Sequence, residues 1–137
     1  MPEPVLAAFN VAGWTYCIDF DYMGGLSKKL NMSCIGATNY SQKTIYLSEA
    51  SATLHEFGHF LDWMLGFPAE YEQLFRAEAS AAPLRNYAKT DSREYFADCF
   101  AYWVKYAENA NAISLLQECA PMTYRYMEDL MRIANRL

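Results

Sequence analysis

The sequence predicts an α+β fold, with a small N-terminal sheet, mixed or antiparallel, packed on a helix and followed by a mostly helical C-terminal part. Two observations predict it. Strand-like alternation of aromatic and polar residues is confined to the first 47 residues, whereas apolar residues recur at three- and four-residue spacing from residue 50 onward. Since 137 residues suffice to bury the core of one domain, we expect residues 1–137 to form a single domain.

Three segments of the N-terminal part have the composition of β-strands. They are residues 14–20, 34–40 and 43–47. In the first of them, aromatic residues alternate with smaller or polar ones, a period of two that is typical of a half-buried strand. Gly24 and Gly25 are expected to break the chain, residues 26–31 to form one short helical turn, and the polar residues 39–42 to connect the last two strands.

Five helices are expected after the strands, with a loop over residues 81–89. Their ranges are 50–65, 68–79, 91–108, 111–119 and 121–136. Ser48 or Ser51 is expected to cap the first of these helices, because a hydroxyl can accept a hydrogen bond from a free first-turn amide. Gly66 suits the end of that helix, and Pro68 suits the first turn of the next.

Composition and charge argue against several classes of function. The net charge is −5 and lysine and arginine form no long run, so we expect no nucleic-acid partner. No stretch approaches the ~20 apolar residues of a membrane helix. The N-terminus lacks the features of a signal peptide, which favours the cytoplasm and leaves a secreted mature domain open. The four cysteines form no C-x-x-C pair, so we expect free, mostly buried thiols rather than disulfides or a cysteine zinc site.

The most informative motif is His55-Glu56-Phe57-Gly58-His59, which contains both histidines of the chain. Residues four apart lie on one face of a helix, so both imidazoles can bind one metal ion, for which zinc is the best match. Glu56 follows the first histidine directly and lies beside the metal, where a base for a metal-bound water belongs. The alternative is two core or surface histidines with a solvated Glu56.

A catalytic zinc ion usually has three protein ligands and one open position, so one more ligand is needed. Because the sequence has no third histidine, a carboxylate must supply it; the downstream candidates are Asp62, Glu70, Glu72, Glu78, Asp91, Glu94 and Asp98. Glu94 is favoured because it begins a second long helix that can return across the first. Asp98, one turn further on, suits a partner for the outer N–H of His55 or His59. The alternative for Glu94 is a capping box with Asp91.

Three segments carry a resemblance to a known family. They read His55-Glu56-Phe57-Gly58-His59-Phe60-Leu61-Asp62, Asn86-Tyr87 and Ser92-Arg93-Glu94-Tyr95-Phe96-Ala97-Asp98-Cys99-Phe100. Over residues 43–105 the chain resembles the zincin metallopeptidases of the gluzincin kind. Within them it is most similar to the branch of anthrax lethal factor and the Pro-Pro endopeptidases, which implies a zincin-like fold.

The resemblance also implies a role for each site residue. His55, His59 and Glu94 would bind one Zn²⁺ ion, and Glu56 would be the general base. Tyr87, seven positions before Glu94, would stabilise the oxyanion; its alternative role is packing against a loop. The expected activity is that of a zinc-dependent endopeptidase acting on a peptide or protein substrate. The chain is shorter than those relatives, so no substrate preference is implied.

Two other functions are compatible with the sequence: a regulatory zinc protease that cleaves a repressor, and a zinc-binding interaction module without catalysis. The module would need a fourth protein ligand, for which Cys99 is nearest to Glu94, although it is expected to face away. The presence of Glu56 favours an enzyme. For the enzyme, residues 43–47 are expected to be an edge strand that pairs with an extended substrate. The aromatic residues of helix 91–108 are expected to be mostly core.

Overall fold

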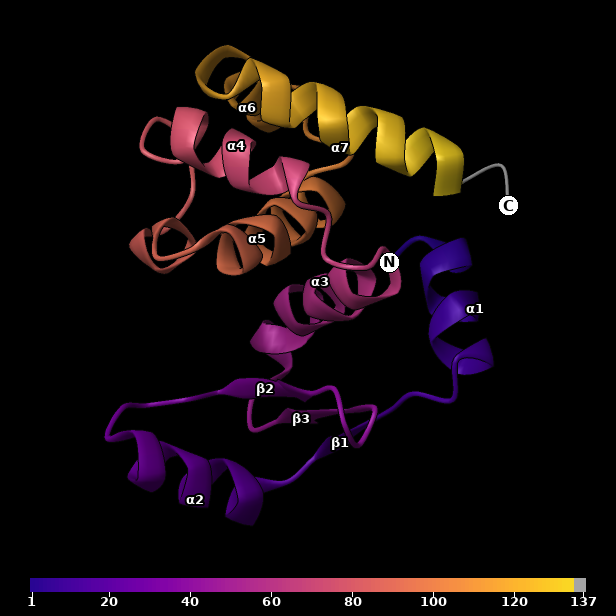
Figure 1. The fold of residues 1–137 in the computed structure, drawn as a ribbon, viewed down its shortest axis with the longest axis vertical. Helices are drawn as coiled ribbons and strands as arrows, with labels where there is room; N and C mark the ends of the chain where they lie inside the picture. Colours follow the sequence, from indigo (N-terminus) through magenta and orange to yellow (C-terminus); the bar gives the residue numbers. More distant parts are fainter. Residues whose placement is uncertain (135–137) are drawn as a thin grey trace.

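Residues 1–134, which the computed structural model describes, form seven α-helices, two short 3-10 helices (η) and three β-strands. In chain order they are α1 (Glu3–Val11), β1 (Thr15–Ile18), α2 (Phe20–Leu30), β2 (Gly36–Asn39), β3 (Thr44–Leu47), η1 (Ala50–Ala52), α3 (Thr53–Met64), α4 (Glu70–Glu78), η2 (Asn86–Lys89), α5 (Ser92–Lys105), α6 (Ala110–Cys119) and α7 (Pro121–Ala134). The sheet lies between α2 and α3, and the later helices gather on the far side of α3 (Figure 1). The predicted α+β class, with its N-terminal sheet and helical C-terminal part, is confirmed.

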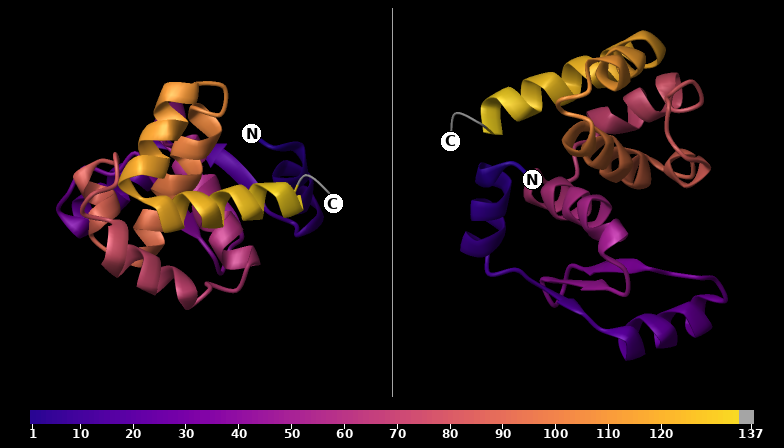
Figure 2. Two further views of the ribbon diagram at one scale, coloured as in Figure 1. Left: turned by 90° about the horizontal axis from the view of Figure 1, so that it is seen from above. Right: turned by 180° about the vertical axis from the view of Figure 1, so that it is seen from behind.

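Helix α1 is an element that the sequence does not predict. Val5 and Phe9, four residues apart, are its buried side chains, and the Phe9 ring centroid lies 4.5 Å from that of Phe57 on α3. The two views of Figure 2 also place α1 beside α3. A single pair of buried residues within nine does not establish a helical period, so this helix could not be identified from sequence. Its packing against α3 determines it.

The expected chain break at Gly24 and Gly25 is wrong, because both lie inside α2, which continues to Leu30 through the helical turn expected over residues 26–31. Glycine in a helix costs about 1 kcal/mol relative to alanine. The cap offsets part of this cost: the Asp19 carboxylate accepts a hydrogen bond from the Tyr22 amide at 2.8 Å. Burial of Met23 against the sheet offsets a further part of this cost. Strand β1 therefore ends at Ile18, directly before the Asp19 cap of α2.

The sheet is mixed, with strand order β1-β3-β2. Strand β3 pairs in parallel with β1, where Thr15 lies opposite Thr44, and antiparallel with β2, where Gly36 lies opposite Leu47. The expectation that residues 43–47 form an edge strand is therefore wrong. The parallel partner, β1, comes from an earlier part of the chain and covers the side of β3 that a hairpin with β2 would leave open. The open edge next to α3 belongs to β2.

Helices α3 and α5 are in direct backbone contact at Gly58. A Cβ atom added to Gly58 would lie 2.7 Å from the Cα atom and 2.8 Å from the carbonyl oxygen of Ala97. Real Cβ atoms do not approach backbone so closely, so only glycine permits this crossing. The crossing fixes the separation of the two helices that carry the motif residues.

Gly58→Ala is expected to lower the free energy of unfolding by about 1–2 kcal/mol. Alanine favours a helix over glycine by about 1 kcal/mol, but overpacking costs about 1–3 kcal/mol, and here the obstacle is backbone that cannot rotate away. Gly24→Ala in α2 is the matched control, because nothing lies within 4 Å of its added Cβ atom. Urea denaturation should show Gly24→Ala stabilised and Gly58→Ala destabilised. A shift of the same sign in both would contradict the contact.

The later helices follow the predicted ranges to within a few residues, with three differences. The second helix begins at Glu70 instead of 68, the predicted loop 81–89 contains η2, and the predicted end of the last helix at 136 lies outside the described residues. Neither Ser48 nor Ser51 caps α3; the helix follows η1 directly, and its N-cap residue is Ala52. Asp91 does cap α5, because its carboxylate accepts a hydrogen bond from the Glu94 amide at 2.8 Å.

The core is rich in aromatic rings, and α5 contributes several of them. Its fully buried aromatic residues are Tyr95, Phe96 and Phe100, as expected, whereas Tyr102, Trp103 and Tyr106 are partly exposed. The four cysteines are free, but only Cys99 is buried; Cys34 and Cys119 are partly exposed and Cys17 is exposed. The expectation of mostly buried thiols is therefore wrong. In residues 1–134, no helix has both the length and the apolar character needed to cross a membrane.

Candidate metal centre

Three side chains from two helices converge on one point. His55 and His59 lie one turn apart on α3, and Glu94 reaches them from the first turn of α5. The Nε2 atoms of the two histidines are 3.2 Å apart, and the Glu94 Oε2 atom lies 2.8 Å from the first and 3.2 Å from the second. The structure thus brings together the three residues that the sequence nominates as metal ligands.

The arrangement of these atoms fits a metal ion of tetrahedral preference. Four zinc ligands with bonds of about 2.0–2.2 Å lie about 3.3–3.6 Å from one another, so the observed separations of 2.8–3.2 Å require only small side-chain movements. Two imidazole nitrogens and one carboxylate oxygen are also the donor set of catalytic zinc sites. Three potential ligand atoms that face one point suit a shared cation, which supports a metal-binding role.

Asp98 binds the Nδ1 atom of His55, on the side of the ring opposite the converging Nε2 atom. Its Oδ1 atom accepts a hydrogen bond from His55 Nδ1 at 2.5 Å, which orients the ring so that Nε2 faces Glu94 and His59. The Arg85 guanidinium binds the same carboxylate in a fork, with Nε at 2.7 Å from Oδ2 and a terminal nitrogen at 2.9 Å from Oδ1. Asp98 thus lies where the sequence places it, as a partner of a ligand imidazole.

Arg85 is a site residue that sequence reasoning missed. It lies in the connection before η2, where no periodic pattern identifies its neighbours. Burial raises the pKa of the Asp98 carboxyl, but hydrogen bonds from His55 and Arg85 outweigh burial and hold that pKa below its usual range. Asp98 therefore stays ionised and holds the His55 ring in one orientation.

The other carboxylates considered from the sequence lie elsewhere. Asp62 is fully buried and binds Arg93, whose terminal nitrogen lies 2.8 Å from its Oδ1 atom. Glu78 is buried and caps α7, accepting hydrogen bonds from two backbone amides. Glu70, Glu72 and Asp91 lie on the surface. Cys99 is fully buried in the core, away from the converging atoms, so it does not offer a fourth ligand.

The protonation of the three converging groups reflects their pairing. Burial lowers the pKa of His55, but hydrogen bonds with Asp98 and Glu94 outweigh burial and raise that pKa to about 9. Burial raises the pKa of Glu94, but hydrogen bonds from the two histidines outweigh burial and lower that pKa to about 2. In the metal-free protein the protonated His55 therefore donates to Asp98 through Nδ1 and to Glu94 through Nε2, and a metal ion would replace the Nε2 proton.

Glu56 is held beside the converging atoms by strand β2. The Thr38 hydroxyl donates a hydrogen bond to Glu56 Oε2 at 3.0 Å. Gly36, two residues earlier on the same face of the strand, lies so close that an added Cβ atom would be 2.9 Å from Glu56 Cγ. Burial raises the pKa of the Glu56 carboxyl. Neither Thr38 nor Gly36 was identified from sequence, since their importance depends on how the strand lies across α3.

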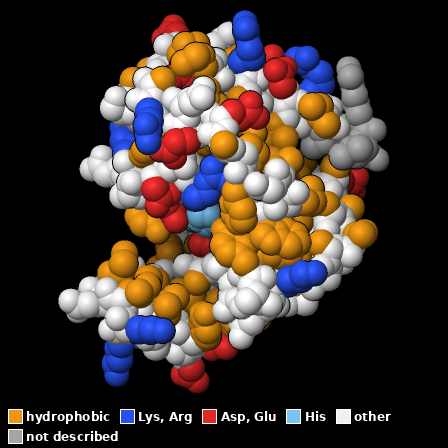
Figure 3. Space-filling model, in the orientation of Figure 1, with side chains coloured by type: hydrophobic (Ala, Val, Ile, Leu, Met, Phe, Trp, Pro, Cys, Tyr) orange, Lys and Arg blue, Asp and Glu red, His pale blue; other side chains and the backbone are white. Residues whose placement is uncertain are grey.

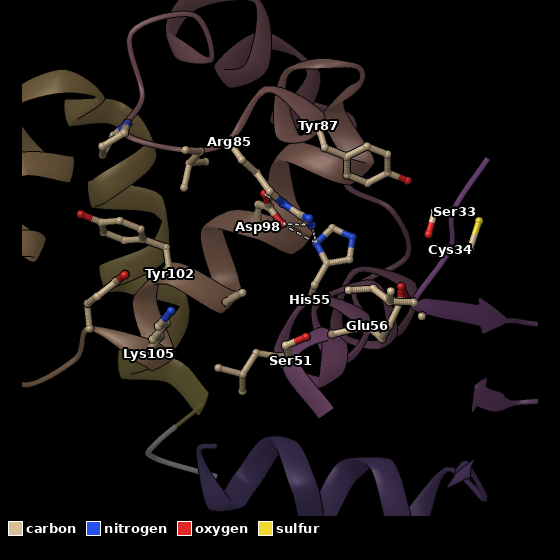
Figure 4. A pocket seen from close by; sticks show the side chains of 18 of the residues that line it. Ser33, Cys34, Ser51, His55, Glu56, Arg85, Tyr87, Asp98, Tyr102 and Lys105 are labelled. Carbon is tan, nitrogen blue, oxygen red and sulfur yellow. Dashed lines mark hydrogen bonds and ion pairs between the residues drawn. The ribbon is translucent and has the colours of Figure 1, made fainter. Parts of the chain in front are cut away.

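Tyr87 lies at the rim of the site, on η2. Its ring centroid is 5.9 Å from that of His55, and the Arg85 guanidinium lies 5.1 Å from the centre of the Tyr87 ring. Figure 4 shows Tyr87 and Glu56 on the same side of the His55 imidazole. Burial and the nearby carboxylate of Glu94 raise the pKa of the Tyr87 phenol to about 12, so the phenol remains a hydrogen-bond donor at neutral pH.

The site lies in a hollow of the surface. Figure 3 shows a histidine at the bottom of this hollow, with charged and apolar side chains around its rim. A cavity of about 620 Å³ adjoins it and is lined by His55, Glu56 and residues of the 32–36 segment, the connection before η2 and α5. The reacting groups of the site are therefore accessible to a bulky molecule.

Two comparisons with known proteins agree on the family. The sequence model of a family described as anthrax toxin lethal factor, N- and C-terminal domain, matches residues 20–130. The Pro-Pro endopeptidase of Clostridioides difficile (strain 630) is 30% identical to the chain over 83 residues. That match covers 58% of this chain and 36% of the relative, so it spans little more than a third of the relative's length. The family match contains all the residues of the site described above.

Proposed function

The chain belongs to the family of anthrax toxin lethal factor, N- and C-terminal domain, and on this premise we propose that it is a zinc-dependent endopeptidase of the gluzincin type, within the zincins. The convergence of His55, His59 and Glu94 to within 3.2 Å of one another carries the proposal. The 30% identity to a Pro-Pro endopeptidase supports a peptidase, and the donor set supports zinc.

In this proposal His55, His59 and Glu94 hold one Zn²⁺ ion, and Asp98 keeps the first of these ligands in position. Bound zinc would supply Lewis acidity and lower the pKa of a coordinated water toward ~7. Glu56 would accept a proton from the attacking water as the water oxygen bonds to the scissile carbonyl carbon, and would pass that proton to the amide nitrogen as the C–N bond breaks. Burial raises the pKa of this carboxyl, which makes it a better proton acceptor, and the hydrogen bond from Thr38 keeps it in position.

Tyr87 is proposed to stabilise the oxyanion of the reaction. Its phenol keeps its proton at neutral pH and can donate to an oxygen on which negative charge develops. The exposed fraction of Tyr87 is 42%, which leaves the hydroxyl free to move toward a substrate. The Arg85 guanidinium lies over the Tyr87 ring, and this cation–π contact stabilises the position of the ring.

Strand β2 is the proposed binding edge for an extended peptide. Its outer edge is free of strand pairing in the described residues, and Thr38 and Gly36 place it against Glu56. A substrate strand added there would present its backbone to the proposed catalytic groups and its alternate side chains to the hollow. This role replaces the one expected for residues 43–47.

The direct test is cleavage of a mixed peptide library, read by mass spectrometry. Zinc-loaded protein should produce cuts that a chelator removes and that added zinc restores. Cuts that persist in the chelator would contradict zinc dependence. The absence of cuts from protein shown to hold one zinc ion would contradict a general endopeptidase and favour a zinc-binding interaction module.

Zinc binding at pH 7.5 is expected to release about one proton per ion. The His55 pKa of about 9 leaves this imidazole protonated in the metal-free protein, and only neutral imidazole binds a metal. Zinc affinity should therefore fall about tenfold for each pH unit below about 9. Titration calorimetry in buffers of different ionisation enthalpy measures the proton release, and a value near zero would contradict the raised pKa.

The same pKa predicts the pH dependence of stability without metal. The folded pKa of about 9 exceeds the ordinary value of 6.5, so protonated His55 stabilises the fold. This contribution is fully present below pH 6.5 and is lost as pH rises toward 9. In the zinc-bound protein the contribution is absent, so the difference in melting temperature between the two forms should grow over this range.

A further inference from the structure

The cavity beside the proposed zinc site extends along one face of α5. Four residues of that helix line it, Asp98, Ala101, Tyr102 and Lys105, and their spacing of three and four places them on a single face. Figure 4 shows Arg85 beside His55 at one end of the cavity and Lys105 beside Tyr102 at the other. The cavity therefore leads away from the proposed catalytic groups toward a lysine.

The charges along the cavity are unevenly distributed. Of its lining residues in the described part of the chain, only Glu56 and Asp98 carry carboxylates, and both lie at the metal end with hydrogen-bond partners of their own. Lys105 forms no ion pair with a carboxylate of residues 1–134. In a chain of net charge −5, the distal end of the cavity thus presents a positive charge with no carboxylate partner in residues 1–134; the ammonium lies 5.3 Å from the centre of the Tyr106 ring.

The walls between these ends combine apolar side chains with the hydroxyls of Ser33 and Ser51. Leu54, Pro83, Leu84 and Ala101 line the cavity, and the Tyr102 hydroxyl is occupied by the Ala112 carbonyl, to which it donates at 2.7 Å. Such walls suit the aliphatic part of a side chain, whereas the lysine at the end suits an anion. A carboxylate at the end of a short apolar stem satisfies both conditions.

The length of the cavity limits where that carboxylate lies in a substrate. From Asp98 to Lys105 the helix rises about 10 Å, and an extended peptide advances about 3.3 Å per residue. The carboxylate therefore belongs to one of the three substrate residues nearest the scissile bond on this side. Its source is either an aspartate or glutamate side chain or the C-terminal carboxylate of a short peptide.

We propose that this cavity is a specificity pocket for a substrate carboxylate, with Lys105 as the residue that recognises it. The inference rests on the proposed peptidase function and deepens it by naming a substrate class. Lys105 also suits the last turn of α5, where a cation interacts favourably with the helix dipole. That structural role predicts no dependence of cleavage on substrate charge, which separates the two roles.

The test uses matched peptides that differ in one group. A peptide cut by the zinc-loaded protein is made with Glu or Gln at each of the three positions, and as a free acid or an amide. We expect kcat/KM to be about 5–30-fold higher for the acidic member of one pair, the range of a partly exposed to partly buried ion pair. The pair that responds identifies the source of the carboxylate.

Variants then assign the preference to one side chain. Lys105→Glu should remove the preference or reverse it in favour of Lys at that position, whereas Lys105→Arg should retain it. Lys29→Glu is the matched control, because it changes the net charge equally on α2, away from the cavity. Lys29→Glu should leave kcat/KM for every peptide within about twofold of the wild type, as expected for an exposed surface substitution.

The outcomes separate this inference from the proposed function. Cleavage with no acidic preference, or a preference that survives Lys105→Glu, overturns the pocket assignment and leaves the peptidase intact. If the wild type cuts no peptide, the proposed function fails, and short fluorescent peptides that differ only as Glu or Gln, or as free acid or amide, are titrated into Glu56→Gln protein with fluorescence anisotropy as readout. Tighter binding of the acidic member that Lys105→Glu abolishes supports the pocket, and equal binding overturns it.

Discussion

Glu56→Gln is expected to lower kcat for peptide hydrolysis by about 10²–10⁴-fold while leaving one zinc ion bound. Glutamine keeps the shape of the side chain and can still accept the hydrogen bond that Thr38 donates to Glu56. It cannot take a proton from water, so only the base is removed. The measurements are kcat on a peptide that the wild type cuts and the zinc content of the purified variant.

A matched control is Glu118→Gln on the exposed surface of α6, which makes the same chemical change away from the site. It should leave both kcat and zinc content unchanged. A Glu56→Gln variant that keeps more than a tenth of the wild-type kcat would show that another group acts as base. A variant that loses zinc would show that Glu56 contributes to the metal site.

Glu94→Gln is expected to weaken zinc binding more than Asp98→Asn does, and both should lower activity. Glu94 offers its Oε2 atom directly to the converging histidines, and its low pKa keeps it anionic. Asp98 acts through His55, and loss of such an outer partner typically costs about 10–100-fold in metal affinity. Competition with a chromophoric chelator gives both affinities.

Excess zinc separates the two roles. It should restore much of the activity of Asp98→Asn, because that variant keeps all three proposed ligands, and little of the activity of Glu94→Gln. Asp129→Asn on α7, which lies outside the site, is the control for handling and charge. Equal affinities in the two site variants would contradict the assignment of Glu94 as a ligand and Asp98 as its support.

The convergence of the two histidines was predictable because its geometry is local. A spacing of four residues on a helix places His55 and His59 on one face whatever the rest of the fold does. Glu94 and Asp98 required only that a second helix return across the first, and the small residues Gly58 and Ala97 allow that crossing. For these residues, helical periodicity and ligand chemistry together limited the candidates.

The strand order, the course of α2 and the supporting residues of the site depended on contacts between distant segments, which one sequence does not reveal. Strand β3 is central because β1 pairs with it from about thirty residues away, and no pattern within residues 43–47 distinguishes a central strand from an edge strand. Thr38 and Arg85 became site residues only through their positions against Glu56 and Asp98. Helix α2 ran through two glycines because its cap and sheet contacts outweigh their weak propensity.

The contact of Gly58 with the Ala97 backbone also limits how far the carboxylate at position 94 can be displaced without loss of the site geometry. A metal bond keeps its length to about ±0.2 Å, whereas replacing a glutamate ligand with aspartate withdraws the carboxylate by about 1.5 Å, one carbon–carbon bond. Many proteins close such a gap by moving an element inward. Here α3 and α5 already touch backbone to backbone, so the gap at Glu94 has no route to closure. The site therefore specifies the length of its proposed third ligand as strictly as its charge.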